Sequence, residues 1–263
     1  MAGQGAWDDL AVRLGSGVAM AGLGIAAIWL GGTWFLALAV LVSALMVWEL
    51  ARMFAPQARA VAVQLALISG VAVVLAGLLP GQFALPLLIA AALVGAGQVG
   101  RDRVLFAIYA LAVILAGYGL VLLRGGGGAG VVIWLVLVVI ATDVMGYFAG
   151  RMLGGPKFWP RISPKKTWSG TVAGWVSAAV VGAIAAALTP AGWGLVALSA
   201  ALSLASQMGD IAESAIKRRK GVKDSSALLP GHGGLLDRFD GLLGAVLAML
   251  VLTALGLAPE MRF

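Results

Sequence analysis

The sequence predicts an all-α, polytopic integral membrane protein with about nine transmembrane helices. Its composition, its long uncharged segments and the distribution of its cations support this prediction. The chain has 263 residues, of which 62% are hydrophobic and 11% are charged, and its mean hydropathy is +1.03. These values lie outside the range of soluble domains. Apolar stretches recur along the whole length, so one signal peptide or anchor does not account for them.

Nine apolar segments are long enough to cross the hydrocarbon core of a bilayer. Backbone N–H and C=O groups cannot stay unpaired in lipid, and barrel strands would alternate polar and apolar residues, so each segment is predicted to be helical. One of the nine contains a carboxylate, Asp143. The segments are residues 14–30, 33–48, 61–79, 84–99, 104–123, 131–150, 171–188, 193–209 and 241–257.

The cations predict the orientation, because Lys and Arg residues are retained in the cytoplasm during membrane insertion. With the amino terminus inside, the cytoplasmic segments, the first of which contains Arg13, hold 16 of the 18 Lys and Arg residues. Arg124 and Arg262 then lie outside, as does the carboxyl terminus. The net charge is +7, but the cations cluster in short loops between apolar runs. Anionic headgroups or phosphorylated substrates are therefore the expected partners, and nucleic acid is not.

We expect a single membrane domain over residues 1–263, because the chain has no long linker and no clear internal repeat. Within it, residues 1–130 form amino-terminal apolar helices, and residues 131–263 hold the polar loops expected to carry the chemistry. Four glycines at 125–128 separate the two parts. They lack the Lys and Ser or Thr of a phosphate-binding loop, so a flexible connector is predicted there.

Polar residues concentrate between residues 210 and 240. Five of the eleven acidic residues and the single histidine fall in this stretch. The absence of cysteine excludes thiolate metal sites and cysteine nucleophiles. The eighth apolar segment continues as a polar helix, and at 100° per residue five of its side chains share a stripe roughly 100° wide. These are Gln207, Asp210, Ser214, Lys217 and Arg218. A carboxylate at the end of an apolar helix is by default a functional candidate, as Asp210 is here.

Two further carboxylates begin the ninth helix. Asp237 and Asp240 are one turn apart and follow a glycine-rich turn whose N–H groups can approach a phosphate closely. Together with Asp210 they form a plausible open site for Mg²⁺, or alternatively Mn²⁺, bound to a nucleotide. The alternative is that acids in a first helical turn only complement the helix dipole.

A basic segment, residues 151–170, joins the sixth and seventh helices on the same side. Its prolines and glycines hold it extended, so that Ser163, Lys166 and Thr167 can donate to phosphate oxygens. Contact with lipid headgroups is the simpler explanation for its arginines. Asp143, just before this segment, is as compatible with pairing to a loop cation as with catalysis.

These residues resemble the signature of the phosphatidate cytidylyltransferase family, also called CDP-diacylglycerol synthases. The resemblance covers residues 143–240, and Ser169 stands where this family often has Glu. The matching blocks are Ser163-Pro164-x-Lys166-Thr167, Gln207-x-Gly209-Asp210, Ser214-x-x-Lys217-Arg218, Lys223-Asp224 and Pro230-Gly231-His232-Gly233-Gly234-x-x-Asp237-Arg238-x-Asp240.

The resemblance implies a multi-helix membrane enzyme with a polar cavity at the cytoplasmic side of the bacterial inner membrane. It implies a homodimer that uses Mg²⁺ to transfer the cytidylyl group of CTP to phosphatidate, a membrane lipid. Catalytic roles are then expected for Asp210, Asp237, Asp240, Lys217 and Arg238, with the three aspartates as metal ligands. Substrate binding is expected for Ser163, Lys166, Thr167, Ser214, Arg218, Lys223, Asp224, His232, Gly233 and Gly234. For His232, bracing of the glycine turn is an equal alternative.

Two other functions remain open from the residues. A CTP-dependent lipid kinase would transfer the γ-phosphoryl group and release CDP. A transporter would also contain many helices and an intramembrane acid, but it predicts functional polar residues near the bilayer midplane. Here nearly all the polar residues lie at one predicted face.

Overall fold

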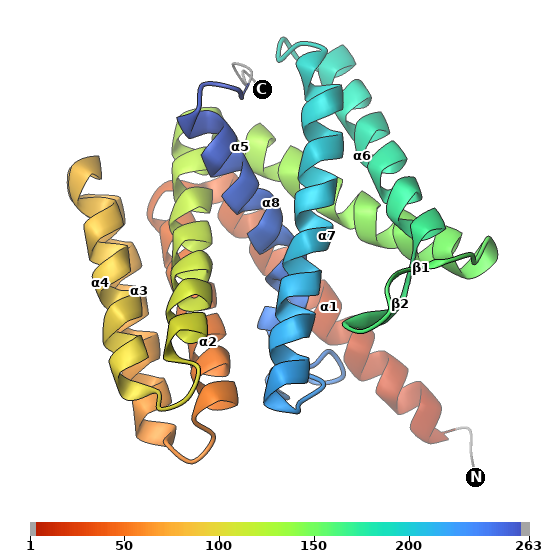
Figure 1. The fold of residues 1–263 in the computed structure, drawn as a ribbon. Coiled ribbons are helices and arrows are strands. Elements are labelled where there is room, and N and C mark those ends of the chain that lie inside the picture. Colours follow the sequence, from red (N-terminus) through yellow and green to blue (C-terminus); the bar gives the residue numbers. More distant parts are fainter. Residues whose placement is uncertain (1–3, 259–263) are drawn as a thin grey trace. The chain divides into compact units, whose positions relative to one another are not determined.

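The computed structural model describes the backbone of residues 4–258 and the side chains of residues 14–258. Arg262 and the side chain of Arg13, both used in predicting the orientation, lie outside the described part. The chain is mainly helical, with one short hairpin (Figure 1). Its elements are α1 (Gln4–Leu30), α2 (Gly32–Phe54), α3 (Arg59–Leu78), the 3-10 helix η1 (Gly81–Phe83), α4 (Ala84–Gln98), α5 (Arg103–Met152), β1 (Lys157–Trp159), β2 (Ser163–Thr167), α6 (Trp168–Leu188), α7 (Gly194–Lys220) and α8 (Leu236–Ala254).

The expected class, an all-α integral membrane protein, is confirmed. By length and composition, six helical segments of the described chain are apolar enough to cross a membrane. Large apolar side chains on them are exposed, among them Leu67 at 65% and Val176 at 59%, as lipid-facing residues are. The six are Gly32–Phe54, Arg59–Leu78, Gly81–Gln98, Arg103–Met152, Trp168–Leu188 and Gly194–Lys220.

The glycine run at 125–128 is not the flexible connector that the sequence predicted. The predicted segments 104–123 and 131–150 both lie in α5, and the helix continues through the first three glycines. Gly128 alone leaves helical geometry, with φ 76° and ψ −171°, and it kinks α5 there. A positive φ has little steric cost for glycine, so the chain bends at one residue. Keeping the other backbone hydrogen bonds avoids unpaired groups in apolar surroundings.

The contacts divide the chain into two compact units. The first comprises Met1–Val121 with Lys220–Arg238, and the second comprises Leu122–Arg219 with Phe239–Phe263. The boundary between the units lies within α5, and the glycine-rich segment Lys220–Arg238 packs in the first unit. The expected single domain with a division after residue 130 stays a prediction.

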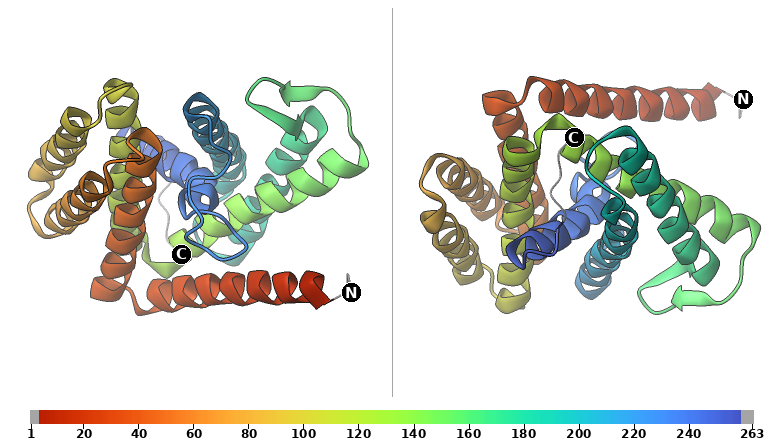
Figure 2. Two further views of the ribbon diagram at one scale, coloured as in Figure 1. Left: turned by 90° about the horizontal axis from the view of Figure 1, so that it is seen from below. Right: turned by 90° about the horizontal axis from the view of Figure 1, so that it is seen from above.

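In the first unit, α2 packs against α3 and α3 against α4. Gly31 and Gly32, both with positive φ, separate α1 from α2, and α1 leaves α2 at a steep angle (Figure 2). The loop before α5 is tied to Lys220, the last residue of α7. Lys220 Nζ lies 2.8 Å from Asp102 Oδ2 and 3.8 Å from the centre of the Phe54 ring. This ion pair links the end of α7 to the loop before α5.

In the second unit, close approach of helices depends on glycine. A Cβ on Gly182 of α6 would lie 2.5 Å from the Leu195 carbonyl oxygen of α7, and a Cβ on Gly209 of α7 would lie 2.2 Å from the Asp240 carbonyl oxygen of α8. Small residues at such crossings let helix backbones pack tightly where lipid supplies no hydrophobic driving force. The α7–α8 contact places Asp210 and Asp240 on neighbouring helices.

Candidate active site

A polar cavity lies in the second unit, between the carboxyl-terminal part of α5, the hairpin strand β2, α6 and α7. Its volume is about 490 Å³, within the range of small-molecule sites. Five of the polar side chains that line it lie in the two stretches that the sequence singled out, residues 151–170 and 210–240, namely Arg151, Lys165, Lys166, Thr167 and Asp210. The other polar side chains of the lining are Thr142, Asp143, Tyr147, Thr171 and Gln207.

The central ion pair of this cavity joins Lys166 and Asp210. Lys166 Nζ lies 2.5 Å from Asp210 Oδ2 and donates to the Gln207 carbonyl oxygen at 3.4 Å. Ser214 Oγ, one turn further along α7, donates to Asp210 Oδ1 at 3.2 Å. Three predicted site residues are thus brought together around one carboxylate. Asp143 lines the same cavity, on the side contributed by α5.

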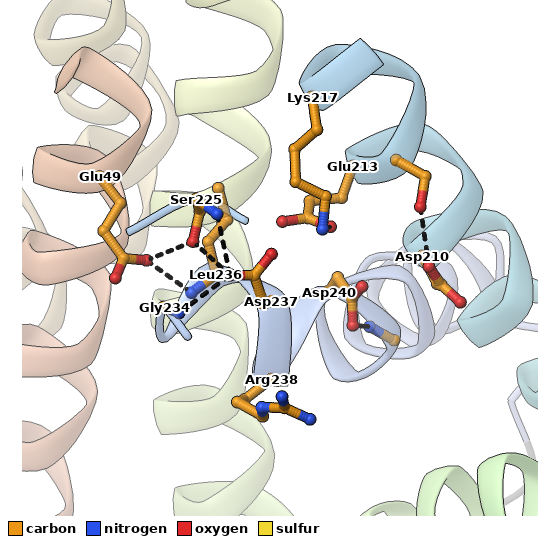
Figure 3. A network of polar contacts seen from close by, with 12 residues as sticks. Glu49, Asp210, Glu213, Lys217, Ser225, Gly234, Leu236, Asp237, Arg238 and Asp240 are labelled. Carbon is orange, nitrogen blue, oxygen red and sulfur yellow. Dashed lines mark hydrogen bonds and ion pairs between the residues drawn. The ribbon is translucent and has the colours of Figure 1, made fainter. Parts of the chain in front are cut away.

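Asp210 also belongs to a group of three acids. Oxygen atoms of Asp210, Glu213 and Asp240 all lie within 4.8 Å of one another. Glu213 is completely buried and forms an ion pair with Lys217, one turn along α7 (Figure 3). Asp240 Oδ1 accepts a hydrogen bond from its neighbour Gly241 N at 2.7 Å. Three carboxylates in this space repel one another, and a cation reduces that repulsion.

The sequence of α7 explains why these acids project from a regular helix. After Gly209 the chain reads Asp-Ile-Ala-Glu-Ser-Ala-Ile-Lys-Arg-Arg-Lys, in which most residues are good helix formers. The Glu213–Lys217 pair has i,i+4 spacing, which adds stability. The helix ends at Lys220 and is followed by Gly221, whose φ of 71° suits a left-handed cap. Asp210 and Glu213 are therefore held on one helical face.

The basic segment is ordered by a hairpin. β1 pairs antiparallel with β2, which begins at the predicted site residue Ser163 opposite Trp159. Thr167 ends β2 and caps α6, because its Oγ1 accepts a hydrogen bond from Gly170 N at 3.2 Å. Capping of this kind fixes the start of α6. It leaves Lys166, the residue before the cap, facing the cavity.

The glycine-rich segment of the first unit is organised by Asp237. Its Oδ2 accepts hydrogen bonds from Ser225 N, Ser225 Oγ and Gly234 N, each at 2.9 Å (Figure 3). A Cβ at Gly234 would lie 1.9 Å from Ser225 Oγ, so only glycine fits. Asp237 and Asp240 are one turn apart in α8, but the structure gives their carboxylates different partners. Of the expected metal trio, Asp210 and Asp240 lie in one group with Glu213, whereas Asp237 holds the segment's backbone.

The other predicted residues of this segment are also largely engaged in its shape. His232 Nδ1 lies 2.8 Å from Ser16 Oγ of α1, and the His232 carbonyl accepts from Arg238 Nε at 2.9 Å and Nη2 at 2.6 Å. Gly233 has φ 82°. These contacts favour bracing of the turn as the role of His232. Arg218, Lys223 and Asp224 are exposed.

The chain matches a known protein family over most of its length. Residues 11–255 match the Cytidylyltransferase family. The chain belongs to this family. The family predicted from the signature residues is therefore confirmed.

Proteins named phosphatidate cytidylyltransferase are among the similar sequences. That of Brucella abortus biovar 1 (strain 9-941) is 48% identical over 143 residues, 53% of this chain and 53% of the relative. That of Helicobacter pylori (strain J99) is 44% identical over 127 residues, which are 48% of this chain and 47% of the relative. That of Mycobacterium leprae (strain TN) is 42% identical over 147 residues, which are 54% of this chain and 46% of the relative. The matches cover about half the length of these relatives.

Two acids of this cytidylyltransferase-family chain were missed in the sequence. Glu213 lies three residues after Asp210, the same spacing that drew attention to Asp237 and Asp240, so spacing would have found it. Glu49 follows the apolar segment 33–48 directly, and its buried carboxylate contacts the glycine-rich segment. An acid at the end of an apolar helix was reason enough to consider it. Its partners, nearly two hundred residues later, could not be read from the pattern.

Proposed function

We propose that this protein transfers the cytidylyl group of CTP to phosphatidate, giving CDP-diacylglycerol and pyrophosphate for phospholipid biosynthesis. The observation that carries the proposal is the position of Asp210. It lines the polar cavity with Lys166 and also belongs to the acidic group with Glu213 and Asp240. Membership of the cytidylyltransferase family and the names of the similar proteins support this substrate pair.

Magnesium is the proposed cofactor, with manganese as an alternative. The acidic group offers hard carboxylate oxygens, which Mg²⁺ prefers together with water and phosphate oxygens. Asp210 and Asp240 are the proposed ligands, and Glu213 lies within the same group. Asp237, one turn before Asp240, stays the proposed third ligand, as the sequence predicted. When bound, the ion would neutralise charge on the CTP phosphates.

The proposed reaction needs placement and charge neutralisation more than a strong base. A phosphate oxygen of phosphatidate, already anionic at neutral pH, attacks the α-phosphorus of CTP. The bond from that phosphorus to the oxygen bridging it to the β-phosphorus breaks, and pyrophosphate leaves with that oxygen. Cations offset the negative charge that gathers on the phosphates. The proposed set is Lys166, Lys217, Arg218, Lys223 and Arg238.

The proposal includes a place in the cell. The positive-inside asymmetry of the loops supports nine spans, a cytoplasmic amino terminus and an active site that faces the cytoplasm. We place the protein in the bacterial inner membrane as a homodimer. Phosphatidate reaches the site from the bilayer, while CTP arrives from the cytoplasm.

Labelled CTP tests the function directly. Purified protein in mixed micelles with phosphatidate and Mg²⁺ is supplied with CTP labelled on the α- or the γ-phosphorus. We expect the α-label in the lipid product, the γ-label in pyrophosphate, and loss of both products when Mg²⁺ is chelated. Transfer of the γ-label to lipid would identify a kinase instead. Folded protein that labels no lipid from either CTP would overturn the proposal.

Lys166 provides a second prediction. In Lys166→Gln the cavity loses the cation paired with Asp210, so kcat/KM for CTP should fall by about 10- to 100-fold, the equivalent of one charge-assisted hydrogen bond. Lys157→Gln is the matched control, because Lys157 is exposed on the partner strand β1. Equal activity of the two variants would exclude Lys166 from substrate binding.

A further inference from the structure

The Glu49 side chain connects helix α2 to the glycine-rich segment. It lies near the end of α2, is 0% exposed, and belongs to the same compact unit as Lys220–Arg238. A buried carboxylate is costly unless donors surround it. Here four donors do. The Glu49 carboxylate therefore needs these four donors in place when the unit is folded.

Each oxygen of Glu49 accepts from one hydroxyl and one backbone N–H group. Oε1 accepts from Ser226 Oγ at 2.6 Å and from Leu235 N at 2.9 Å. Oε2 accepts from Ser225 Oγ at 3.2 Å and from Leu236 N at 2.7 Å. One side chain thus holds both ends of the segment from Ser225 to Leu236. Two of its donors are N–H groups at the start of α8, which have no partner within the helix.

The Ser225 hydroxyl joins Glu49 to Asp237. Ser225 Oγ lies 3.2 Å from Glu49 Oε2 and 2.9 Å from Asp237 Oδ2, so its single O–H proton is shared between two carboxylates (Figure 3). Gly234 fits between them, because a Cβ there would lie 2.6 Å from Glu49 Oε1. Asp237 and Glu49 of α2 thus share one hydroxyl partner.

We propose that Glu49 is a positioning residue: it holds the segment from Ser225 to Leu236 and, through Ser225, sets the orientation of Asp237. The inference rests on the proposed function, in which Asp237 takes part in cytidylyl transfer. It gives the amino-terminal helices a part in the chemistry, where the sequence had suggested only an apolar scaffold.

The replacement Glu49→Gln tests this role at nearly constant volume. A glutamine amide can accept through only one of its two terminal atoms. In the wild type, each Glu49 oxygen accepts from a backbone N–H group. Whichever way the glutamine amide is turned, its NH₂ group therefore faces one of these N–H groups, which cannot accept a hydrogen bond. Asp102→Asn is the control. Asp102 belongs to the same unit and accepts at 2.8 Å from Lys220, a residue outside the segment from Ser225 to Leu236.

The full-length variants are compared in detergent by kinetics and by amide hydrogen exchange. In Glu49→Gln we expect kcat for CDP-diacylglycerol to fall at least tenfold and the amides of residues 225–236 to exchange faster. In Asp102→Asn we expect both to stay as in the wild type. In an Asp237→Asn background the same Glu49 change should lower kcat less than threefold further, because its effect passes through Asp237.

Several outcomes would overturn the inference. These are wild-type exchange in Glu49→Gln, kcat unchanged in that variant, or effects of the two substitutions that multiply. If Glu49→Gln does not fold, Ser226→Ala removes one of the four donors, and it should produce smaller changes in the same direction. If the wild type makes no CDP-diacylglycerol, the proposed function fails, while the exchange measurement still decides whether Glu49 holds the segment.

Discussion

Replacing Asp240 by Asn is expected to reduce cytidylyl transfer by about 10²- to 10³-fold, with Asp210→Asn similar in size. Both residues supply oxygens to the acidic group with Glu213, all within 4.8 Å. Asparagine keeps the volume of the side chain but removes its charge. A divalent ion would then be bound more weakly, so the Mg²⁺ concentration that gives half-maximal rate should rise.

Asp240→Asn is expected to affect stability differently from activity. Three neighbouring carboxylates repel one another when no cation is bound, so removing one charge should not destabilise the fold. Thermal unfolding of Asp240→Asn without Mg²⁺ should therefore begin at or above the temperature of the wild type. Asp102→Asn, which alters an acid outside this group, should leave the Mg²⁺ requirement unchanged. Full activity of both Asp240→Asn and Asp210→Asn would remove the proposed metal site.

Replacing Gly209 by Ala is the second change expected to have a large effect. A Cβ at this position would lie 2.2 Å from the Asp240 carbonyl oxygen and 3.0 Å from Gly244 N. Both obstacles are backbone atoms, so α7 and α8 must move apart. Forcing extra volume into a packed contact destabilises a protein by about 1–3 kcal/mol. The separation would also draw Asp210 away from Asp240, so activity should fall even where the protein still folds.

Gly22→Ala is the matched control for this prediction. Gly22 lies in the interior of α1, and a Cβ added there would have no heavy atom within 4 Å. Alanine has the higher helix propensity, so this variant should be as stable as the wild type or slightly more stable. Thermal unfolding in detergent, followed by the labelled-CTP assay, compares the two. Equal stability and activity would show that the α7–α8 approach does not require glycine.

The family and the positions of the helices could be read from the sequence because both depend on local information. Each of the nine predicted apolar segments overlaps a helix of the structure, and none extends past the end of that helix by more than three residues. Lipid leaves a backbone few choices other than the helix, so composition alone decides the class. The signature residues likewise reported the family through their spacing. Lys166 and Asp210, both predicted as site residues, line one cavity and form an ion pair.

What each acid touches was decided only by the tertiary structure. Asp237 and Asp240 looked equivalent in sequence, yet one holds Ser225 and Gly234 while the other joins Asp210 and Glu213. Periodicity places side chains on a helical face, but the partner of that face comes from another helix. Glu49 makes the point most clearly, because its donors lie more than 170 residues away. A buried carboxylate must find donors when the chain folds, and distant segments supply them.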